Sequence, residues 1–214
     1  MVNLLLKNTI HTILLLSSLL VPDIAMAGGK ASLEHFFEQV QTLTARFQQV
    51  ILDEGMNPID QSSGMVRLVR PGRFRWDYDA PQEQHIISDG KKVWLYDVEL
   101  AQVTIRKVDR ALGKTPALIL AGQGDLNKTF NIKEMGKQGR LQWVLLEPKQ
   151  QEEFNSIRIG FEGSSLRLLE MVDGLGQITR ITLSNSIINR RLNPQLFSFT
   201  VPAGADVIDE TRAQ

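Results

Sequence analysis

The feature that most limits the fold of this chain is a long series of short segments in which apolar and polar residues alternate. A period of two is typical of strands that bury one face. Turn residues such as Asp89-Gly90, Gly163-Ser164 and Asp173-Gly174 separate the segments, and the spacing predicts an antiparallel meander. The candidate strands are 64–70, 73–78, 84–88, 92–97, 101–107, 129–135, 141–147, 154–161, 166–172, 177–188 and 197–201.

One helix is expected before these strands. Ser32 can cap its N-terminus, and apolar residues then recur at helical spacing. These residues are Leu33, Phe36, Phe37 and Val40. Apolar and polar residues alternate from Leu43 onward, so we predict a helix over about 32–42 and a further strand over about 43–53.

The N-terminal residues contain the features of a secretory signal peptide in the expected order. Lys7 precedes a short apolar run at 10–21, and the Ala-Met-Ala of residues 25–27 is a small-residue cleavage site. The apolar run is too short to span a bilayer. We expect residues 1–27 to be removed, and residues 28–214 to form a single exported domain with a sizeable core.

Composition argues against several classes of protein. The chain has no cysteine, which leaves no residue for a disulfide or for lipid modification of a thiol. It has 24 Lys and Arg against 24 Asp and Glu, and no polybasic segment, so neither nucleic acid nor an anionic membrane surface is an expected partner. We interpret Lys91-Lys92 and Arg190-Arg191 as solvated hairpin ends. Since there is no heptad pattern and no second long apolar segment, we expect a monomer.

Patterns that carry catalysis or bind metals are missing from the sequence. His35 and His85 lack metal-ligand spacing. Gly113-Lys114-Thr115 lacks the earlier glycine of a phosphate-binding loop, because Val108 occupies that position. There is no G-x-S-x-G nucleophile motif. We therefore expect no catalytic residue, no metal and no cofactor.

Two further groups of residues have ordinary interpretations. Asp77, Asp79 and Asp97 fall near the ends of candidate strands, and we interpret them as solvated turn residues. The glycines at 122 and 124 form a lone G-x-G, which we interpret as a loop.

The stretch from residue 64 to residue 78 is the most informative part of the chain. If alternation continues through Pro71-Gly72, one face is wet and the other is apolar except for Arg70. The wet face holds Arg67, Arg73, Arg75 and Asp77, and the apolar face holds Val66, Leu68, Arg70, Phe74, Trp76 and Tyr78. A guanidinium among aromatic groups must find acceptors, which makes Arg70 a candidate latch to the carbonyls of a neighbouring loop or helix end. Equally, Pro71-Gly72 could be a turn that resets the alternation and leaves Arg70 on the surface, with Phe74 and Trp76 as plain core.

Residues 109–122 follow a different pattern. Thr115 can cap a helix and Pro116 suits its first position. The next five residues are all apolar, namely Ala117, Leu118, Ile119, Leu120 and Ala121. A short helix without a polar face cannot lie on a wet surface, so this helix either plugs a core or covers a cavity.

Seven motifs occur along the chain in a specific order and spacing. They are 47–49 (FQQ), 70–76 (RPGRFRW), 86–97 (IISDGKKVWLYD), 102–104 (QVT), 115–116 (TP), 197–202 (FSFTVP) and 206–209 (DVID). Together they resemble the LolA family of periplasmic outer-membrane lipoprotein carriers, over essentially all of residues 28–214.

This resemblance implies a mainly β fold with helices, an open and strongly curved antiparallel half-barrel whose concave apolar face the helices cover. It implies a periplasmic chaperone that takes lipid-modified proteins from an inner-membrane ABC transporter and delivers them to an outer-membrane receptor. The latch falls on Arg70, the acyl-chain cavity on Leu68, Phe74 and Trp76, and the lid on Pro116, Leu118, Ile119 and Leu120. Lys114 departs from the small or neutral residue expected before the lid.

Two other functions stay open. One is a periplasmic sensor module of the same fold that binds mislocalised lipoproteins and regulates a membrane partner, although such proteins usually carry a second domain. The other is an enzyme acting on a lipid or glycan, for which the sequence offers no nucleophile–base set. Intact lipoprotein that co-purifies would indicate a carrier, and turnover products would indicate an enzyme.

Overall fold

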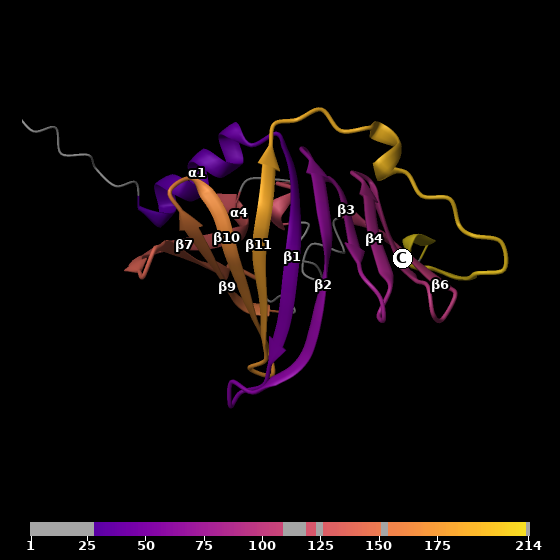
Figure 1. Ribbon diagram of the computed structural model, residues 1–214, viewed down its shortest axis with the longest axis horizontal. Coiled ribbons are helices and arrows are strands. Elements are labelled where there is room, and N and C mark those ends of the chain that lie inside the picture. The colour runs from indigo at the N-terminus through magenta and orange to yellow at the C-terminus, as the bar shows by residue number, and fades with distance from the viewer. Residues whose placement is uncertain (1–27, 109–118, 123–125, 151–153, 213–214) are drawn as a thin grey trace, which may run out of the picture.

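The computed structural model describes residues 28–108, 119–122, 126–150 and 154–212. Within these ranges the chain forms one strongly curved sheet with few helices (Figure 1). No helix in this part of the chain is both long and apolar enough to cross a bilayer. The helices are α1 (Gly29–Gln39), α4 (Leu126–Thr129), η1 (Pro194–Phe197) and η2 (Glu210–Arg212). The strands are β1 (Thr42–Leu52), β2 (Pro58–Val69), β3 (Arg73–Tyr78), β4 (Gln84–Asp89), β5 (Lys92–Asp97), β6 (Gln102–Lys107), β7 (Phe130–Gln138), β8 (Leu141–Pro148), β9 (Phe154–Glu162), β10 (Ser165–Asp173), β11 (Ile178–Ile188) and β12 (Asp206–Asp209).

The strand order confirms the predicted meander. Across the sheet it runs β12-β6-β5-β4-β3-β2-β1-β11-β10-β9-β8-β7. Neighbouring strands are antiparallel except for β12, which runs parallel to β6. The long strand β1 pairs with both β2 and β11, so it joins a wing of strands β2 to β6 to a wing of strands β7 to β11.

The predicted strand at 197–201 is wrong. Its first residue ends η1 and the rest is irregular, while the last strand is β12, farther along the chain. Phe197 is buried, and the ring of Phe199 lies 6.3 Å from Trp94 and 5.7 Å from Tyr96. The alternation therefore reflects aromatic packing against the sheet and not strand pairing.

The predicted helix at about 32–42 needs correction at both ends, because α1 ends at Gln39 and Thr42 already belongs to β1. Helix α1 begins at Gly29, and Ser32 is not its cap but a buried residue whose hydroxyl donates to the Gly163 carbonyl at 3.0 Å. The cap comes instead from β7, where Glu134 accepts the Gly29 and Lys30 N–H groups at 2.8 and 2.9 Å. Gly29 is required here, because a Cβ would lie 2.4 Å from the carbonyl oxygen of Trp143.

Charged residues on the outer face form cross-strand clusters. Asp77 is not the solvated turn residue that we expected, because it lies within β3 and contacts Arg67, Arg75 and His85 at 2.8–2.9 Å. Antiparallel pairing of β2, β3 and β4 brings those side chains together on one face.

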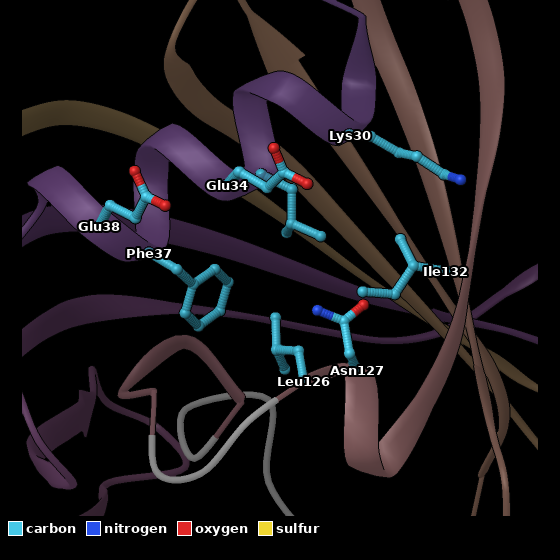
Figure 2. A pocket seen from close by; sticks show the side chains of 8 residues that line it. Lys30, Glu34, Phe37, Glu38, Leu126, Asn127 and Ile132 are labelled. Atoms are coloured by element: carbon cyan, nitrogen blue, oxygen red, sulfur yellow. The ribbon is translucent and has the colours of Figure 1, made fainter.

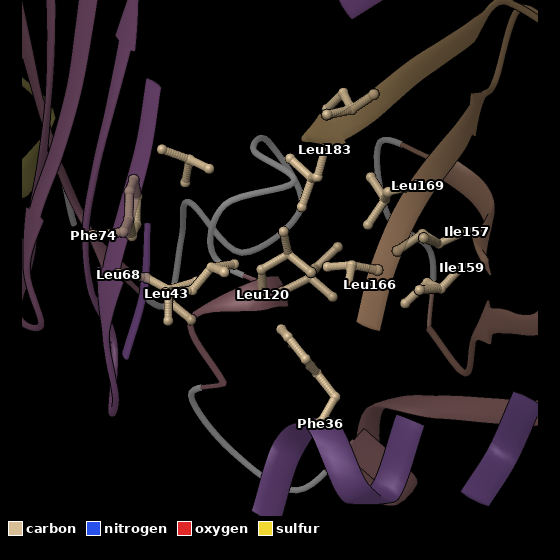
Figure 3. Close-up of a cluster of buried hydrophobic side chains, with 14 of the residues drawn as sticks. Phe36, Leu43, Leu68, Phe74, Leu120, Ile157, Ile159, Leu166, Leu169 and Leu183 are labelled. Carbon is tan, nitrogen blue, oxygen red and sulfur yellow. The ribbon is translucent and has the colours of Figure 1, made fainter. Parts of the chain in front are cut away.

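The core lies between the two wings of the sheet. Figure 3 shows Leu68 and Phe74 on one side, Ile157 and Leu169 on the other, and Leu120 between them. All five belong to one cluster of buried apolar side chains. Phe36 of α1 reaches the same cluster, so α1 and the segment around Leu120 cover the apolar inner face of the sheet.

The capping of α1 by Glu134 leads to a prediction about the free energy of unfolding. Burial raises the pKa of the Glu134 carboxyl, but hydrogen bonds from the backbone of Lys30, Gly29 and Gly136 outweigh it and lower the pKa from 4.5. Glu134→Ala should reduce the free energy of unfolding by up to about 1 kcal/mol. Because the folded-state pKa is depressed, this contribution should be complete above pH 4.5 and shrink as the pH falls further.

Urea titrations of the wild type and of Glu134→Ala, above and below pH 4.5, measure the difference in the free energy of unfolding. The control is Glu147→Ala, which removes only a surface ion pair with Lys133 and should cost less. An equal cost for the two variants at neutral pH would contradict the capping role.

Candidate functional site

Arg70 stands where β2 ends, immediately before the turn to β3. Its Nη1 donates to the Phe37 carbonyl at 3.0 Å, and its Nη2 donates to the Leu120 carbonyl at 2.9 Å. Phe37 lies in the last turn of α1, whose carbonyls have no partner within the helix. The guanidinium thus joins the hairpin β2–β3 to α1 and to the segment at 119–122. The alternative in which Arg70 is an ordinary surface residue is wrong.

Aromatic rings enclose the same guanidinium. Its central carbon lies 4.7 Å from the ring centroid of Phe36 and 4.3 Å from that of Phe37, distances at which a cation is attracted to a ring face. Removal from water lowers the pKa of Arg70 to about 10, so it remains charged at neutral pH. A partly desolvated charge depends strongly on its few acceptors.

Backbone contacts at the same turn reinforce these bonds. The Gly72 N–H donates to the Ala121 carbonyl at 3.1 Å, and the Arg70 N–H donates to the Gln41 carbonyl at 2.9 Å. Gly122 closes the arrangement with a φ of +62°, and a Cβ there would lie 3.2 Å from Nη1 of Arg70 and 3.3 Å from the Phe37 ring. Sequence reasoning missed Gly122, because a lone glycine carries no sign of what approaches it.

The apolar residues predicted for the cavity share a face with this site. Leu68, Phe74 and Trp76 are each at most 2% exposed, and they lie in the cluster that also contains Leu120. Their side chains are therefore in contact with other core residues in this structure. Of the four predicted lid residues, Ile119 and Leu120 are helical and buried, whereas Pro116 and Leu118 lie outside the described residues, as do Thr115 and Lys114.

An open cleft lies beside this core, between α1, α4 and β7 (Figure 2). Its volume is about 350 Å³, at the lower end of the usual range for ligand pockets. Leu33, Phe37, Leu126 and Ile132 form its apolar wall, and Lys30, Glu34, Asn127 and Glu38 its polar one. Phe37 connects the cleft to the Arg70 site, since its ring lines the cleft while its carbonyl accepts from Arg70. Nothing in the sequence pattern indicated this cleft, because its walls come from three separate segments.

The chain shares most of its length with proteins of one family. Residues 38–200 match the family described as outer membrane lipoprotein carrier protein LolA. The outer-membrane lipoprotein carrier protein of Nitrosospira multiformis is 44% identical over 195 residues, which cover 90% of this chain and 94% of that protein. The carrier protein of Methylococcus capsulatus is 43% identical over 182 residues, with 85% and 88% covered.

The chain belongs to the LolA family. The predicted family resemblance is therefore confirmed. A solved structure agrees on the fold: that of an uncharacterized conserved protein from Thermus thermophilus has a TM-score of 0.55 at 12% identity, covering 85% of this chain and 98% of that one. At such low identity the likeness shows the fold alone.

The polar contacts of the Arg70 side chain in this LolA-family chain are hydrogen bonds to backbone carbonyls. In the ranges that the structure describes, no group of three or more His, Asp or Glu side chains could hold a metal ion. The arrangement holds α1 and residues 119–122 against an apolar core, because the bonds of Arg70 link these separate elements.

Replacement of Gly122 tests how tightly this site is packed. In Gly122→Ala the new methyl group meets Arg70 and Phe37 and the backbone must keep φ near +62°, so we expect a loss of stability of about 1–2 kcal/mol and looser fastening of residues 119–122. Gly139→Ala is the matched control, since Gly139 has the same φ of +62° and a Cβ added there would have nothing within 4 Å.

Hydrogen exchange at Ile119, Leu120 and Ala121 measures the fastening separately from global stability. We expect faster exchange in Gly122→Ala than in Gly139→Ala when global stability is matched with urea. Identical exchange rates in the two variants would mean that the close approach of Gly122 to Arg70 does not help to hold residues 119–121 in place.

Proposed function

We propose that this protein is a periplasmic carrier that binds the acyl chains of lipid-modified proteins on the apolar inner face of its sheet. The observation that carries the proposal is the site at Arg70, which fastens two covering elements over that face with bonds that can break. The names of the relatives support lipoprotein cargo, because each is called an outer-membrane lipoprotein carrier protein. They favour a carrier over the regulatory module.

The energetics suit such a cargo. Burial of each methylene group contributes about 0.8 kcal/mol, so one long acyl chain offers on the order of 10 kcal/mol. A pocket that stood open would hold this cargo too tightly for release. When the competent open state is only fractionally populated, the apparent affinity falls in proportion. The bonds of Arg70 set that population.

Opening would convert the core into the cavity. Leu120 lies between the two wings of the sheet (Figure 3) and is 1% exposed. If the segment at 119–122 moves away, Leu68, Phe74 and Trp76 lose this cover and can contact an acyl chain instead. The cleft between α1, α4 and β7 is lined by Leu33, which belongs to the same buried cluster as Leu68, Phe74 and Trp76. We infer that the acyl chain enters there.

The remaining parts of the proposal follow from the family. Cargo would come from an inner-membrane ABC transporter and pass to an outer-membrane receptor, without a chemical step, a metal or a cofactor. Residues 1–27, which lie outside the described part of the chain, would be a cleaved signal peptide, and residues 28–214 a single domain that acts as a monomer.

Arg70→Leu tests the latch. The variant loses both carbonyl bonds and gains apolar surface, so the cargo-bound open state gains stability relative to the closed state. We expect it to accept lipoprotein as the wild type does but to transfer at least tenfold less to a purified receptor in a fixed time. Co-sedimentation of a labelled lipoprotein with receptor-containing membranes measures the transfer.

Two further variants sharpen this result. Arg70→Lys keeps the charge but not the planar fork that reaches two carbonyls, and should lie between Leu and the wild type. Arg140→Leu makes the same change in the β7–β8 turn and should transfer normally. Normal transfer by Arg70→Leu would rule out the latch, and failure of the wild type to take up lipoprotein would rule out the carrier function.

The lid itself can be followed by hydrogen exchange. Elements that move for a ligand open at lower free energy than the rest of a fold. The amides of Ile119 to Ala121 should therefore exchange faster than those of Val93 to Tyr96 in β5, and cargo should change the former and leave the latter alone. Equally slow exchange in both segments, with and without cargo, would make 119–121 structural core.

A further inference from the structure

Six basic residues that are far apart in the sequence lie at the same end of the strands of the sheet. These residues are Arg73, Lys91, Lys92, Lys107, Arg190 and Arg191, which we call the basic edge. Five of them are exposed and Arg73 is half-buried. Among the described residues none of the six forms an ion pair with an acidic side chain. The nearby carboxylate of Asp89 accepts the backbone N–H groups of Lys91 and Lys92.

The strand register places these residues at the same end of the strands. Lys107 is paired with Lys92 across β5 and β6, and Arg73 is paired with Asp89 across β3 and β4. At the centre of the sheet, Thr42 at the start of β1 donates through its hydroxyl to the Arg190 carbonyl at 2.7 Å. The basic edge therefore runs along the ends of seven consecutive strands, from β6 to β11. At a strand spacing of roughly 4.8 Å it is about 29 Å long.

The opposite ends of these strands have the reverse charge. Turns 53–57, 79–83, 98–101 and 174–177 contain no Lys or Arg. In and beside them are Asp53, Glu54, Asp60, Asp79, Glu83, Asp97, Glu99 and Asp173. Basic side chains thus gather at one end of these seven strands and acidic side chains at the other, and an anionic surface attracts the basic end.

We propose that the basic edge is a docking surface for anionic lipid bilayers, bound weakly and reversibly through phosphate headgroups. The cations are on long flexible side chains along a line of strand ends, which suits many mobile headgroups. Two exposed apolar side chains, Ile187 (43%) and Ile188 (52%), stand at the end of β11 next to Arg190 and Arg191. Apolar side chains beside basic ones favour the boundary between headgroups and acyl chains.

The basic edge is also the edge at which the Arg70 site lies. Arg70 and Gly72, which hold the segment at 119–122, belong to the turn between β2 and β3 that precedes Arg73. Docking by the basic edge would therefore present the fastened segment to the membrane surface, and leave the acidic turns pointing away from it. The inference about docking does not depend on cargo, since it concerns the empty protein.

Vesicle sedimentation tests the proposal with the protein from residue 28 onward. The probes are vesicles of phosphatidylcholine alone and of phosphatidylcholine mixed with phosphatidylglycerol, at low and high salt. Lys91→Gln, Lys92→Gln, Arg190→Gln and Arg191→Gln are combined in one variant. The matched control combines Glu54→Gln, Asp60→Asn, Glu83→Gln and Glu99→Gln, which removes as many charges from the acidic turns.

We expect the wild type to bind the mixed vesicles at low salt, to bind phosphatidylcholine at least tenfold less, and to be released by high salt. The basic-edge variant should lose at least tenfold in binding to the mixed vesicles, and the control variant should bind as well as the wild type or better. Equal binding of the wild type to both vesicle types, or undiminished binding of the basic-edge variant, would overturn the proposal. Lipoprotein transfer from detergent solution to the receptor, measured in parallel, shows whether the carrier function stands or fails on its own.

Discussion

A guanidinium taken partly out of water must be given acceptors, and in this protein the need is met by the ends of two other elements. Arg70 bonds to the carbonyl of Phe37 in the last turn of α1 and to the carbonyl of Leu120. If Arg70 moved away and no water replaced it, the guanidinium and the two carbonyls would each lack a hydrogen-bond partner, which is costly. One side chain therefore bonds the hairpin β2–β3 both to helix α1 and to the segment at 119–122.

This form of attachment differs from the one that holds the sheet. Strands of the sheet share long ladders of backbone bonds, as the eleven paired positions of β1 and β2 show. Within the described residues, the segment at 119–122 is held by one bond from Arg70, one from Gly72 and the burial of Ile119, Leu120 and Ala121. Few hydrogen bonds, each contributing about 1 kcal/mol net, can be replaced by a ligand that offers more apolar contact. The proposed carrier function requires such a difference between a stable sheet and a more weakly held cover.

Local patterns predicted most of the strands because most strands have one buried face. Phe74 and Trp76 lie on the predicted face with Leu68, and all are buried, since Pro71-Gly72 turns the chain without reversing which face is apolar. The patterns gave wrong predictions where the role of a residue depends on a segment that is distant in the sequence. Ser32 resembles a cap, but Glu134 arrives from β7 to perform that task. Phe197 and Phe199 resemble a strand, but their rings pack on the sheet instead.

The sequence by itself determined the alternation that makes an antiparallel sheet, and it offered Arg70 as a charged residue on the apolar face, provided that the alternation continues through Pro71-Gly72. Both are properties of neighbours along the chain, which the period of a strand connects to a face. Only the tertiary structure decided which carbonyls Arg70 reaches, why Gly122 must lack a side chain, and how Lys91-Lys92 and Arg190-Arg191 join one edge instead of remaining separate hairpin ends. Those depend on pairing between segments distant in sequence, and strand register, which sets the distances between such segments, is a property of the folded sheet and not of any one stretch.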